Sequence, residues 1–463
     1  MNLKGVFQHD IEIKNICIDS RHVIEGSLFV CIVGANIDGH KFALSAEERG
    51  AAAILAEHEL PQVRIPVIIV PDTKEALATV TANFYGNPAD KLKLIGVTGT
   101  NGKTTVTYIV KNILEACGKK VGLIGTNNNM IMQEVVHAER TTPDALELHE
   151  LFKRMLDSGC EYVIMEVSSH ALDRKRVFGC HFEVGAFTNL TGDHLDYHDT
   201  MQNYLLAKMK LFDNSDKKLI NFDDQSGQII AKKYDVIKYG IDSGDLRAKD
   251  IKLLNDRVEF KCCYDEEEHY MCLGIPGKFS VYNALTAIGI CLNLGISLEK
   301  ISQGLATARG VVGRIEVVET GKDFTVLIDY AHTPDGLRNV LETVRGFCQG
   351  RLIVVFGCGG DRDRTKRPLM GSIASDLADF VIITTDNPRT EEPIEIIKDI
   401  ELGMGDGEYR LIENRRDAIK YALDYAKKND IIILAGKGHE TYQILKDKTI
   451  HFDEREVIAE FTG

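Results

Sequence analysis

The sequence predicts an α/β protein built of three domains. Its 463 residues exceed what one hydrophobic core usually supports. Apolar runs of strand length alternate with helix-length segments in two stretches of the chain, and a glycine-rich turn joins one such strand to a helix. We expect a small mixed α/β N-terminal domain over 1–88, a central domain with a mainly parallel sheet over 89–311, and a C-terminal Rossmann-like, doubly wound domain over 312–463.

The first expected domain holds short apolar runs separated by turn residues. Residues 27–33, 51–56 and 67–70 are its strand candidates. The turn Gly86-Asn87-Pro88 follows them and marks the boundary near residue 88.

The central domain is expected to contain parallel strands. Its strand candidates are the apolar runs 92–97, 162–167, 184–189 and 218–222. After the first of them, residues 103–117 place apolar side chains at helical spacing until Gly118.

The turn over residues 96–105 predicts a phosphate cradle. Its backbone N–H groups, at the start of a helix, face an anion. Lys103 can reach the β- and γ-phosphates of a nucleotide, and the Thr104 hydroxyl can bind the accompanying Mg²⁺. The strict phosphate-loop pattern has glycine where this chain has Val97, so a glycine-rich turn without a nucleotide is the alternative. We interpret the central domain as a phosphate-loop ATPase.

Glu166 ends the strand candidate 162–167 and indicates a metal site. A hard cation takes oxygen ligands and keeps several waters, so Glu166, Thr104 and phosphate oxygens would suffice for Mg²⁺. The alternative is a strand-end carboxylate with no metal.

Within residues 193–198, His194 and His198 are four positions apart and two aspartates are three positions apart. This spacing fits either a transition-metal site on a helix or a polar loop. Lys208 and Lys210 follow in an amphipathic helix, where the pattern alone does not distinguish them from solvated surface lysines.

In the last domain, polar or glycine-rich segments follow each strand candidate. The strands are expected at 324–329, 351–356, 380–385 and 430–435, and the segments after them are 330–332, 357–364, 386–389 and 436–440. Such segments meet in one cleft at the carboxyl ends of a doubly wound sheet. Their arginines and acids suit a zwitterionic amino acid, with surface salt bridges as the alternative.

Composition excludes several classes of function. With 55 basic and 69 acidic residues the net charge is −14 and spread along the chain, which argues against nucleic-acid binding. The start lacks the apolar core of a signal peptide, and no run approaches the roughly 18 apolar residues of a membrane span. The 11 cysteines lack paired spacing. We expect a cytoplasmic protein with reduced cysteines.

Taken together, the motifs resemble those of the Mur ligases over essentially the whole chain. The residues that carry the resemblance are Asp19-Ser20-Arg21, 99–105, Thr141-Thr142-Pro143, 166–170, Thr188-Asn189-Leu190, 193–198, 313–316, 329–334, 386–389 and 436–440.

The resemblance implies ATP and two Mg²⁺ ions. The implied ATP contacts are Gly99, Thr100, Asn101, Gly102, Lys103, Thr104, Thr105, Asn283, Arg314 and Asp329. It implies one Mg²⁺ at Thr104 and Glu166, and a second at His194 and Lys208, with Lys208 modified by CO₂ to a carbamate. Lys103, Lys208 and His194 are the implied catalytic residues.

The resemblance also implies two further substrates. A UDP-N-acetylmuramoyl dipeptide would contact Ser20, Thr141, Thr142, Ser168, Arg174 and Arg176, with Arg174 standing where other members have glutamine. An amino acid would contact Arg362, Asp386, Asn387, Pro388, Arg389, Gly436 and Glu440. The Asp-Asn-Pro-Arg quartet over 386–389 resembles members that add meso-diaminopimelate, whereas lysine-adding members differ there.

The reaction implied by the resemblance is an ADP-forming ligation in peptidoglycan precursor synthesis. An acyl phosphate on the D-glutamate γ-carboxylate would react with the amine of the incoming amino acid, in a protein expected to be a monomer. Three alternatives remain: the same chemistry with lysine or another amino acid, a folylpolyglutamate-type synthetase, and an ATP-driven switch that forms no bond.

Overall fold

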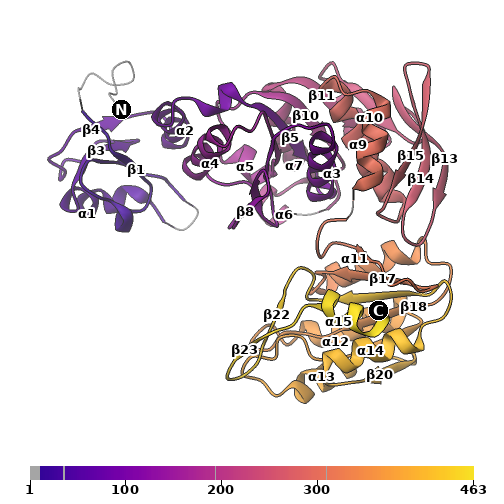
Figure 1. The fold of residues 1–463 in the computed structure, drawn as a ribbon. Coiled ribbons are helices and arrows are strands. Elements are labelled where there is room, and N and C mark those ends of the chain that lie inside the picture. The colour runs from indigo at the N-terminus through magenta and orange to yellow at the C-terminus, as the bar shows by residue number, and fades with distance from the viewer. Residues whose placement is uncertain (1–10, 35–36, 193, 309) are drawn as a thin grey trace. The chain divides into compact units, whose positions relative to one another are not determined.

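The computed structural model describes residues 11–34, 37–192, 194–308 and 310–463. Contacts divide the chain into two compact units, Met1–Lys238 and Tyr239–Gly463 (Figure 1). The domain boundaries near residues 88 and 311 stay predictions.

The first unit begins with a four-stranded parallel sheet in the order β1-β2-β3-β4. Its elements are β1 (Asn15–Cys17), β2 (Ser27–Val30), β3 (Ala51–Ala56), β4 (Val67–Ile69), α1 (Ala43–Glu48), α2 (Thr73–Phe84) and three short 3₁₀ helices, η1 (Ser20–His22), η2 (Gly39–Phe42) and η3 (Pro88–Lys91). Apolar side chains from both faces of the sheet are buried, so the sheet carries a core on each side. Helix α2 begins at the Asp72 cap, whose carboxylate accepts the N–H groups of Lys74 and Glu75.

A larger sheet follows in the same unit, with the order β11-β10-β5-β9-β6-β7-β8. Its strands are β5 (Lys93–Thr98), β6 (Val121–Ile124), β7 (Asn129–Ile131), β8 (Glu134–Val136), β9 (Tyr162–Glu166), β10 (Phe182–Phe187) and β11 (Ser215–Asn221). The strands from β11 to β6 are parallel, and β7 and β8 add an antiparallel edge. Strand β5 is flanked by β9 on one side and β10 on the other, so the chain reverses its direction of winding at the carboxyl end of β5, where ligands of such sheets bind.

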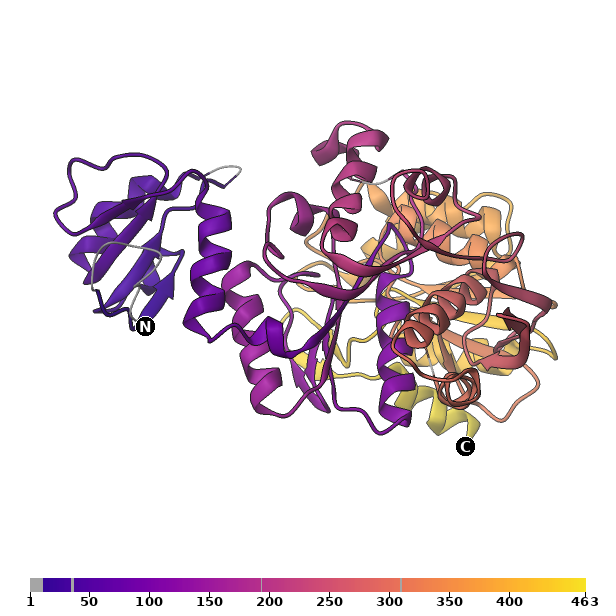
Figure 2. The same ribbon diagram turned by 90° about the horizontal axis from the view of Figure 1, so that it is seen from above.

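The helices of this part connect the strands. They are α3 (Lys103–Ala116), α4 (Ala145–Asp157), α5 (Ser169–Asp173), α6 (Leu195–His198), α7 (Met201–Asp213) and α8 (Gln225–Ile230). Helix α4 packs against α2, and the two lie side by side in both views (Figures 1 and 2).

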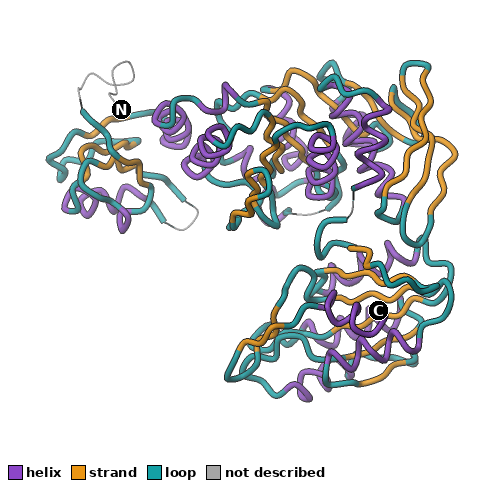
Figure 3. Tube along the Cα trace, in the orientation of Figure 1, coloured by secondary structure: helices purple, strands orange, loops and turns teal. Residues whose placement is uncertain are grey.

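The second unit opens with hairpins that the sequence analysis did not anticipate. After the short β12 (Ile237–Gly240), strands β13 (Leu246–Leu253), β14 (Val258–Tyr264) and β15 (Glu267–Leu273) are antiparallel (Figure 3). The turn between β14 and β15 is Asp265-Glu266, with both residues at positive φ, as in a type I′ turn. This turn lacks the usual glycine, so the hairpin has no clear signal in the sequence. Helices α9 (Lys278–Asn293) and α10 (Leu298–Thr307) follow.

The rest of the second unit is a doubly wound six-stranded sheet in the order β16-β17-β21-β18-β19-β20. Its strands are β16 (Glu316–Val318), β17 (Thr325–Asp329), β18 (Leu352–Phe356), β19 (Phe380–Ile383), β20 (Tyr409–Leu411) and β21 (Ile431–Ala435), and its helices are α11 (Pro334–Arg345), α12 (Lys366–Leu377), α13 (Pro393–Glu401), α14 (Arg415–Tyr425) and α15 (Glu454–Thr462). Only β16 runs antiparallel to its neighbour. Apolar clusters cover both faces, and a small hairpin of β22 (Tyr442–Ile444) and β23 (Thr449–His451) projects from it. The predicted α/β fold with mainly parallel sheets is confirmed.

Candidate active site

The glycine-rich turn lies between β5 and the N-terminus of α3, as predicted. Gly99 and Gly102 have φ of 145° and 85°, and a β-carbon on Gly99 would lie 1.9 Å from the Thr188 hydroxyl oxygen. The Lys103 ammonium donates to the carbonyl oxygens of Gly99 (2.9 Å) and Thr100 (2.8 Å). A cation and a helix N-terminus therefore meet in one turn, which suits a polyphosphate.

The end of β10 holds this turn in place. The backbone N–H of Thr100 donates to the Asn189 carbonyl at 2.9 Å, and that of Asn101 donates to the Asn189 side-chain oxygen at 3.0 Å. The Thr188 hydroxyl donates to the Asn101 carbonyl at 2.6 Å. No role of their own was predicted for Thr188 and Asn189, and these contacts show that they fix the shape of the phosphate loop.

Glu166 and Thr104 meet beside the turn. The Thr104 hydroxyl donates to Glu166 Oε2 at 3.0 Å, and Thr126 donates to the same carboxylate from its N–H (2.8 Å to Oε1) and its hydroxyl (3.0 Å to Oε2). Glu166 is 1% exposed. Hydroxyl and carboxylate oxygens are the donors that Mg²⁺ prefers, so these residues fit a hard cation. Thr126 also belongs to this group, although it was not predicted from the sequence.

His194 and Lys208 both lie near the Tyr204 ring. The Lys208 Nζ lies 4.4 Å from the centre of the Tyr204 ring, and the His194 ring lies 6.1 Å from it. Lys208 is 1% exposed and donates to the Gly99 carbonyl at 2.7 Å, which brings it to the phosphate loop. Lys210 instead pairs with Asp173 at the surface.

No three His, Cys, Asp or Glu side chains are grouped as metal ligands in the part of the chain that the structure describes. Asp193 lies outside that part. The transition-metal interpretation of residues 193–198 therefore has no support among the described side chains.

A cavity of about 440 Å³ lies in the first unit. Five cationic residues line it with two acidic ones, and the rest of the lining is mostly apolar. The charged residues are Lys74, Arg140, Arg174, Lys175, Arg176, Asp144 and Asp173. This excess of positive charge suits an anionic ligand such as a nucleotide diphosphate.

Two of the predicted sugar-peptide residues, Arg174 and Arg176, line this cavity. The Arg176 guanidinium donates to the Thr142 carbonyl at 2.7 Å. The Thr142 hydroxyl donates to the Glu166 carbonyl at 2.8 Å and lies 3.4 Å from the Ser168 hydroxyl. These contacts connect the cavity wall to the strand that ends at Glu166.

The other four predicted sugar-peptide residues, Ser20, Thr141, Thr142 and Ser168, do not line the cavity. The Thr141 hydroxyl lies 3.1 Å from that of Thr126. Ser20 lies in η1 and is buried, while Ile18 lines the cavity just before it.

The three remaining predicted ATP residues belong to the second unit. Asn283 is buried in α9, and the Arg314 guanidinium lies 5.9 Å from the centre of the Tyr330 ring. Asp329 accepts the backbone N–H groups of Ile315 and Ala331, both at 2.8 Å, and its burial raises its pKa. Asp329 thereby fixes the turn that carries Arg314.

The predicted amino-acid residues gather at the carboxyl ends of β19 and β21. The Asn387 amide donates to Glu440 Oε2 at 2.9 Å, and its oxygen accepts the N–H of Ile444 from β22 at 2.9 Å. Gly436 has φ of 114°, and a β-carbon there would lie 3.5 Å from Asp386 Oδ2. The hairpin that the sequence did not predict therefore supports the predicted quartet.

Lys437 occupies the middle of this group, although the sequence did not single it out. Its ammonium is fully buried and lies 3.4 Å from Asp386 Oδ1, 3.3 Å from Asn387 Oδ1 and 3.2 Å from Glu440 Oε2. Lysines are rarely fully buried unless paired. Here one cation lies against two carboxylates, so the group keeps a net negative charge that can receive an ammonium group.

Replacing Lys437 with methionine is expected to lower the free energy of unfolding by roughly 3 to 5 kcal/mol, because two nearly buried carboxylates lose their cation. Chemical denaturation checks this. The matched control is Lys446→Met, since Lys446 pairs with Glu392 at the surface (3.7 Å) and should contribute at most about 1 kcal/mol. If the free energy of unfolding fell by the same small amount in both variants, Lys437 would not be stabilising buried carboxylates.

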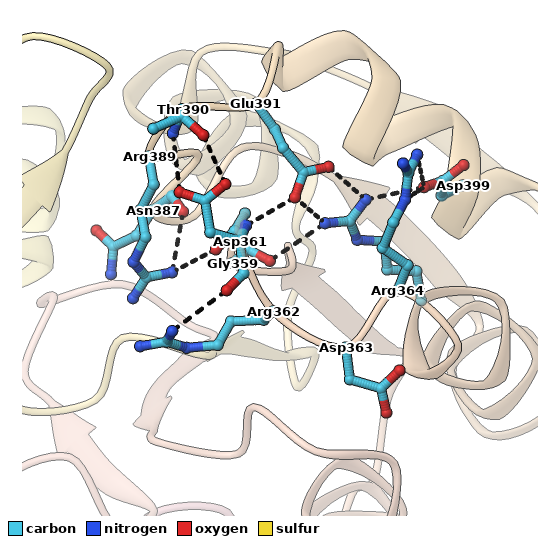
Figure 4. Close-up of polar contacts among 12 residues, drawn as sticks. Gly359, Asp361, Arg362, Asp363, Arg364, Asn387, Arg389, Thr390, Glu391 and Asp399 are labelled. Atoms are coloured by element: carbon cyan, nitrogen blue, oxygen red, sulfur yellow. Dashed lines mark hydrogen bonds and ion pairs between the residues drawn. The ribbon is translucent and has the colours of Figure 1, made fainter.

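Arg362 and Arg389 supply positive charge beside this acidic group. The Arg389 guanidinium donates to the Gly360 carbonyl at 2.8 Å, and that of Arg362 donates to the Asp361 carbonyl at 3.2 Å. Their side chains extend to the same side of the two loops that carry them (Figure 4). Pro388 lies between Asn387 and Arg389 and is buried. Separate patches of opposite charge suit a ligand with both carboxylate and ammonium groups.

Three family models match the chain. Residues 12–85 match the model described as "Mur ligase family, catalytic domain", residues 97–291 match "Mur ligase middle domain", and residues 313–438 match "Mur ligase, glutamate ligase domain".

Full-length relatives agree with these matches. The chain is 52% identical over 460 residues to "UDP-N-acetylmuramoyl-L-alanyl-D-glutamate--2,6-diaminopimelate ligase 1" of Clostridium acetobutylicum, covering 98% of this chain and 95% of that protein. It is 51% identical to the ligase of the corresponding name from Clostridium botulinum, covering 97% and 95%. A solved structure of a ligase of that name matches with a TM-score of 0.77 and 31% identity, covering 97% and 94% of the two chains. The chain therefore belongs to the Mur ligase family.

Proposed function

We propose that this protein is an ADP-forming ligase that adds meso-diaminopimelate to the D-glutamate γ-carboxylate of UDP-N-acetylmuramoyl-L-Ala-D-Glu. The observation that carries the proposal is the phosphate loop whose Thr104 hydroxyl lies 3.0 Å from Glu166, since ATP is what makes a carboxylate reactive toward an amine. The names of the full-length relatives supply the identity of the two other substrates. The product is a peptidoglycan precursor.

The proposed reaction has two steps. An oxygen of the γ-carboxylate attacks the γ-phosphorus of ATP, and ADP leaves. The amine of diaminopimelate then attacks the acyl carbon, loses a proton, and inorganic phosphate leaves with the former carboxylate oxygen. Both reactants of the first step are anions, so Lys103 and the loop N–H groups supply the positive charge that lowers their repulsion.

Mg²⁺ fits the residues beside the loop. Thr104 and Glu166 would hold one ion, and it would neutralise charge on the phosphate oxygens. His194 and a carbamate on Lys208, formed from CO₂, would hold a second Mg²⁺ ion. The carbamate nitrogen keeps one N–H, which can maintain the 2.7 Å hydrogen bond from Lys208 to the Gly99 carbonyl.

We assign the nucleotide-sugar substrate to the cationic cavity. Arg174 and Arg176 line it, and Arg176 connects it through Thr142 to the strand that ends at Glu166. The Arg174 guanidinium lies over the Tyr197 ring at 5.1 Å and donates to the Tyr197 hydroxyl at 3.3 Å, which holds it in place. Arginine at this position can therefore bind an anionic part of the substrate.

Lys175 is expected to shape this cavity. Its ammonium pairs with Asp72 (2.7 Å) and Glu75 (2.6 Å) at the start of α2, and so holds that helix against the segment that carries Arg174 and Arg176. Replacing Lys175 with methionine should raise KM for the nucleotide-sugar dipeptide about fivefold with little change in kcat, an effect of about 1 kcal/mol for a half-exposed pair. Steady-state kinetics check this.

Lys153→Met is the matched control for Lys175, because Lys153 also pairs with a carboxylate, Asp157, but lies outside the cavity lining. Similar KM values for the two variants would contradict a role for Lys175 in substrate binding.

The experiment that tests the proposed function is a panel of amino acids. The chain is mixed with ATP, the UDP-muramoyl dipeptide and, in separate reactions, meso-diaminopimelate, L-lysine and L-ornithine, and phosphate release and product mass are measured. We expect a tripeptide product only with diaminopimelate. A tripeptide formed only with lysine would show that the chain adds lysine in place of diaminopimelate. Nucleotide binding without any product would indicate an ATP-driven switch.

A cytoplasmic location is part of the same proposal, since ATP and the nucleotide-sugar dipeptide are small soluble substrates, and the proposed oligomeric state is a monomer. No helix among the described residues is long and apolar enough to cross a membrane. Gel filtration with light scattering tests the monomer, for which a mass near 51.5 kDa is expected.

A further inference from the structure

Two loops that carry Arg362 and Arg389 are joined by a reciprocal pair of contacts (Figure 4). The Asp361 carboxylate accepts from Thr390, through the hydroxyl at 2.6 Å and the backbone N–H at 3.2 Å. In return, the Glu391 carboxylate accepts the backbone N–H of Asp361 at 2.7 Å. Each loop therefore uses a side chain to hold the backbone of the other.

A buried arginine supports the second of these contacts. Arg367 is fully buried and donates to both oxygens of Glu391, at 2.7 and 3.0 Å, and to Asp399 at 2.8 Å. This guanidinium lowers the pKa of Glu391, so the carboxylate stays charged and able to accept from Asp361. Helix α12, which carries Arg367, thus anchors the pair of loops.

The two loops are held in conformations that need such support. Asp361 and Arg389 have φ of 54° and 53°, where residues with a side chain are rarely found. The loops also touch closely, because a β-carbon on Gly360 would lie 1.9 Å from the Pro388 carbonyl oxygen. If either loop relaxed to another conformation, the guanidinium of the arginine that it carries would move.

We propose that Asp361, Thr390 and Glu391 are positioning residues for amino-acid selection: by joining the two loops they set where Arg389 meets the distal carboxylate of diaminopimelate. This inference rests on the proposed function. It assigns selectivity to three residues outside the Asp-Asn-Pro-Arg quartet, none of which needs to touch the substrate.

The test variant is Thr390→Val, which removes the hydroxyl at an exposed position and keeps the size of the side chain. We expect KM for diaminopimelate to rise about tenfold, the size of a lost hydrogen bond to a charged group, while KM for ATP stays unchanged. Thr390→Ser restores the hydroxyl and should restore KM. The matched control is Thr365→Val, because Thr365 donates to Asp363 at the same 2.6 Å but within one loop.

A double-variant cycle separates positioning from a merely structural role. If Thr390 acts through Arg389, Thr390→Val should lower kcat/KM for diaminopimelate by less than about twofold in an Arg389→Ala background. A full tenfold loss in that background, no effect of Thr390→Val alone, or a parallel rise in KM for ATP would each overturn the inference. Failure of the proposed function has a separate readout: the unmodified chain would release no phosphate in response to diaminopimelate. In that case the inference is overturned as well.

Discussion

Replacing Lys103 with alanine is expected to lower ADP formation to below about one-hundredth of that of the unmodified chain. The ammonium lies in the phosphate loop, 2.9 and 2.8 Å from the carbonyl oxygens of Gly99 and Thr100, and would face the phosphates of ATP. Loss of one preorganised donor to developing charge lowers kcat by roughly 10²- to 10³-fold. Coupled measurement of ADP at saturating substrates checks the result.

Lys119→Ala is the control for this loss, because Lys119 follows the same helix and pairs with Glu161 at the surface at 3.5 Å. That variant should keep normal turnover. Near-normal turnover in Lys103→Ala would contradict the assignment of ATP to this loop.

Replacing Arg389 with alanine is expected to raise KM for diaminopimelate by about 30-fold or more and to leave KM for ATP within about twofold. Without the guanidinium the distal carboxylate of the substrate would lose its proposed cationic partner, at a cost of roughly 2 to 5 kcal/mol. The native residue already carries a β-carbon at φ of 53°, so alanine adds no new backbone strain. Steady-state kinetics with each substrate varied in turn measure both constants.

Arg338→Ala is the control for the Arg389 variant. Arg338 lies on α11 and pairs loosely with Glu342, at 3.8 Å, so its removal should change neither constant. Equal rises in KM for diaminopimelate and for ATP in Arg389→Ala would argue against a role for Arg389 in amino-acid recognition.

The phosphate loop was predictable because its signals are local. An apolar run, closely spaced glycines and a lysine at the start of a helical pattern all lie within a few residues, and the structure places α3 at Lys103–Ala116, close to the expected 103–117. Strand β9 likewise ends at Glu166, where the sequence analysis expected a strand-end carboxylate. Local patterns of this kind are the strongest signals in a single sequence.

The supporting residues were not predictable, because their partners are distant in the chain. Thr126 reaches Glu166 across 40 residues, and the Ile444 N–H reaches Asn387 across 57. Lys437 is indistinguishable from a surface lysine until β21 and its neighbours bury it. Such roles depend on tertiary packing, which local propensity does not encode.

The acyl-phosphate mechanism transfers one oxygen atom from the substrate carboxylate to phosphate, and this transfer can be measured. UDP-muramoyl dipeptide labelled with ¹⁸O at both oxygens of the D-glutamate γ-carboxylate is incubated with the chain, ATP and diaminopimelate, and the released phosphate is analysed by mass spectrometry. We expect one ¹⁸O atom in each phosphate, together with a tripeptide product. Unlabelled phosphate, or phosphate released without a tripeptide, would contradict this mechanism.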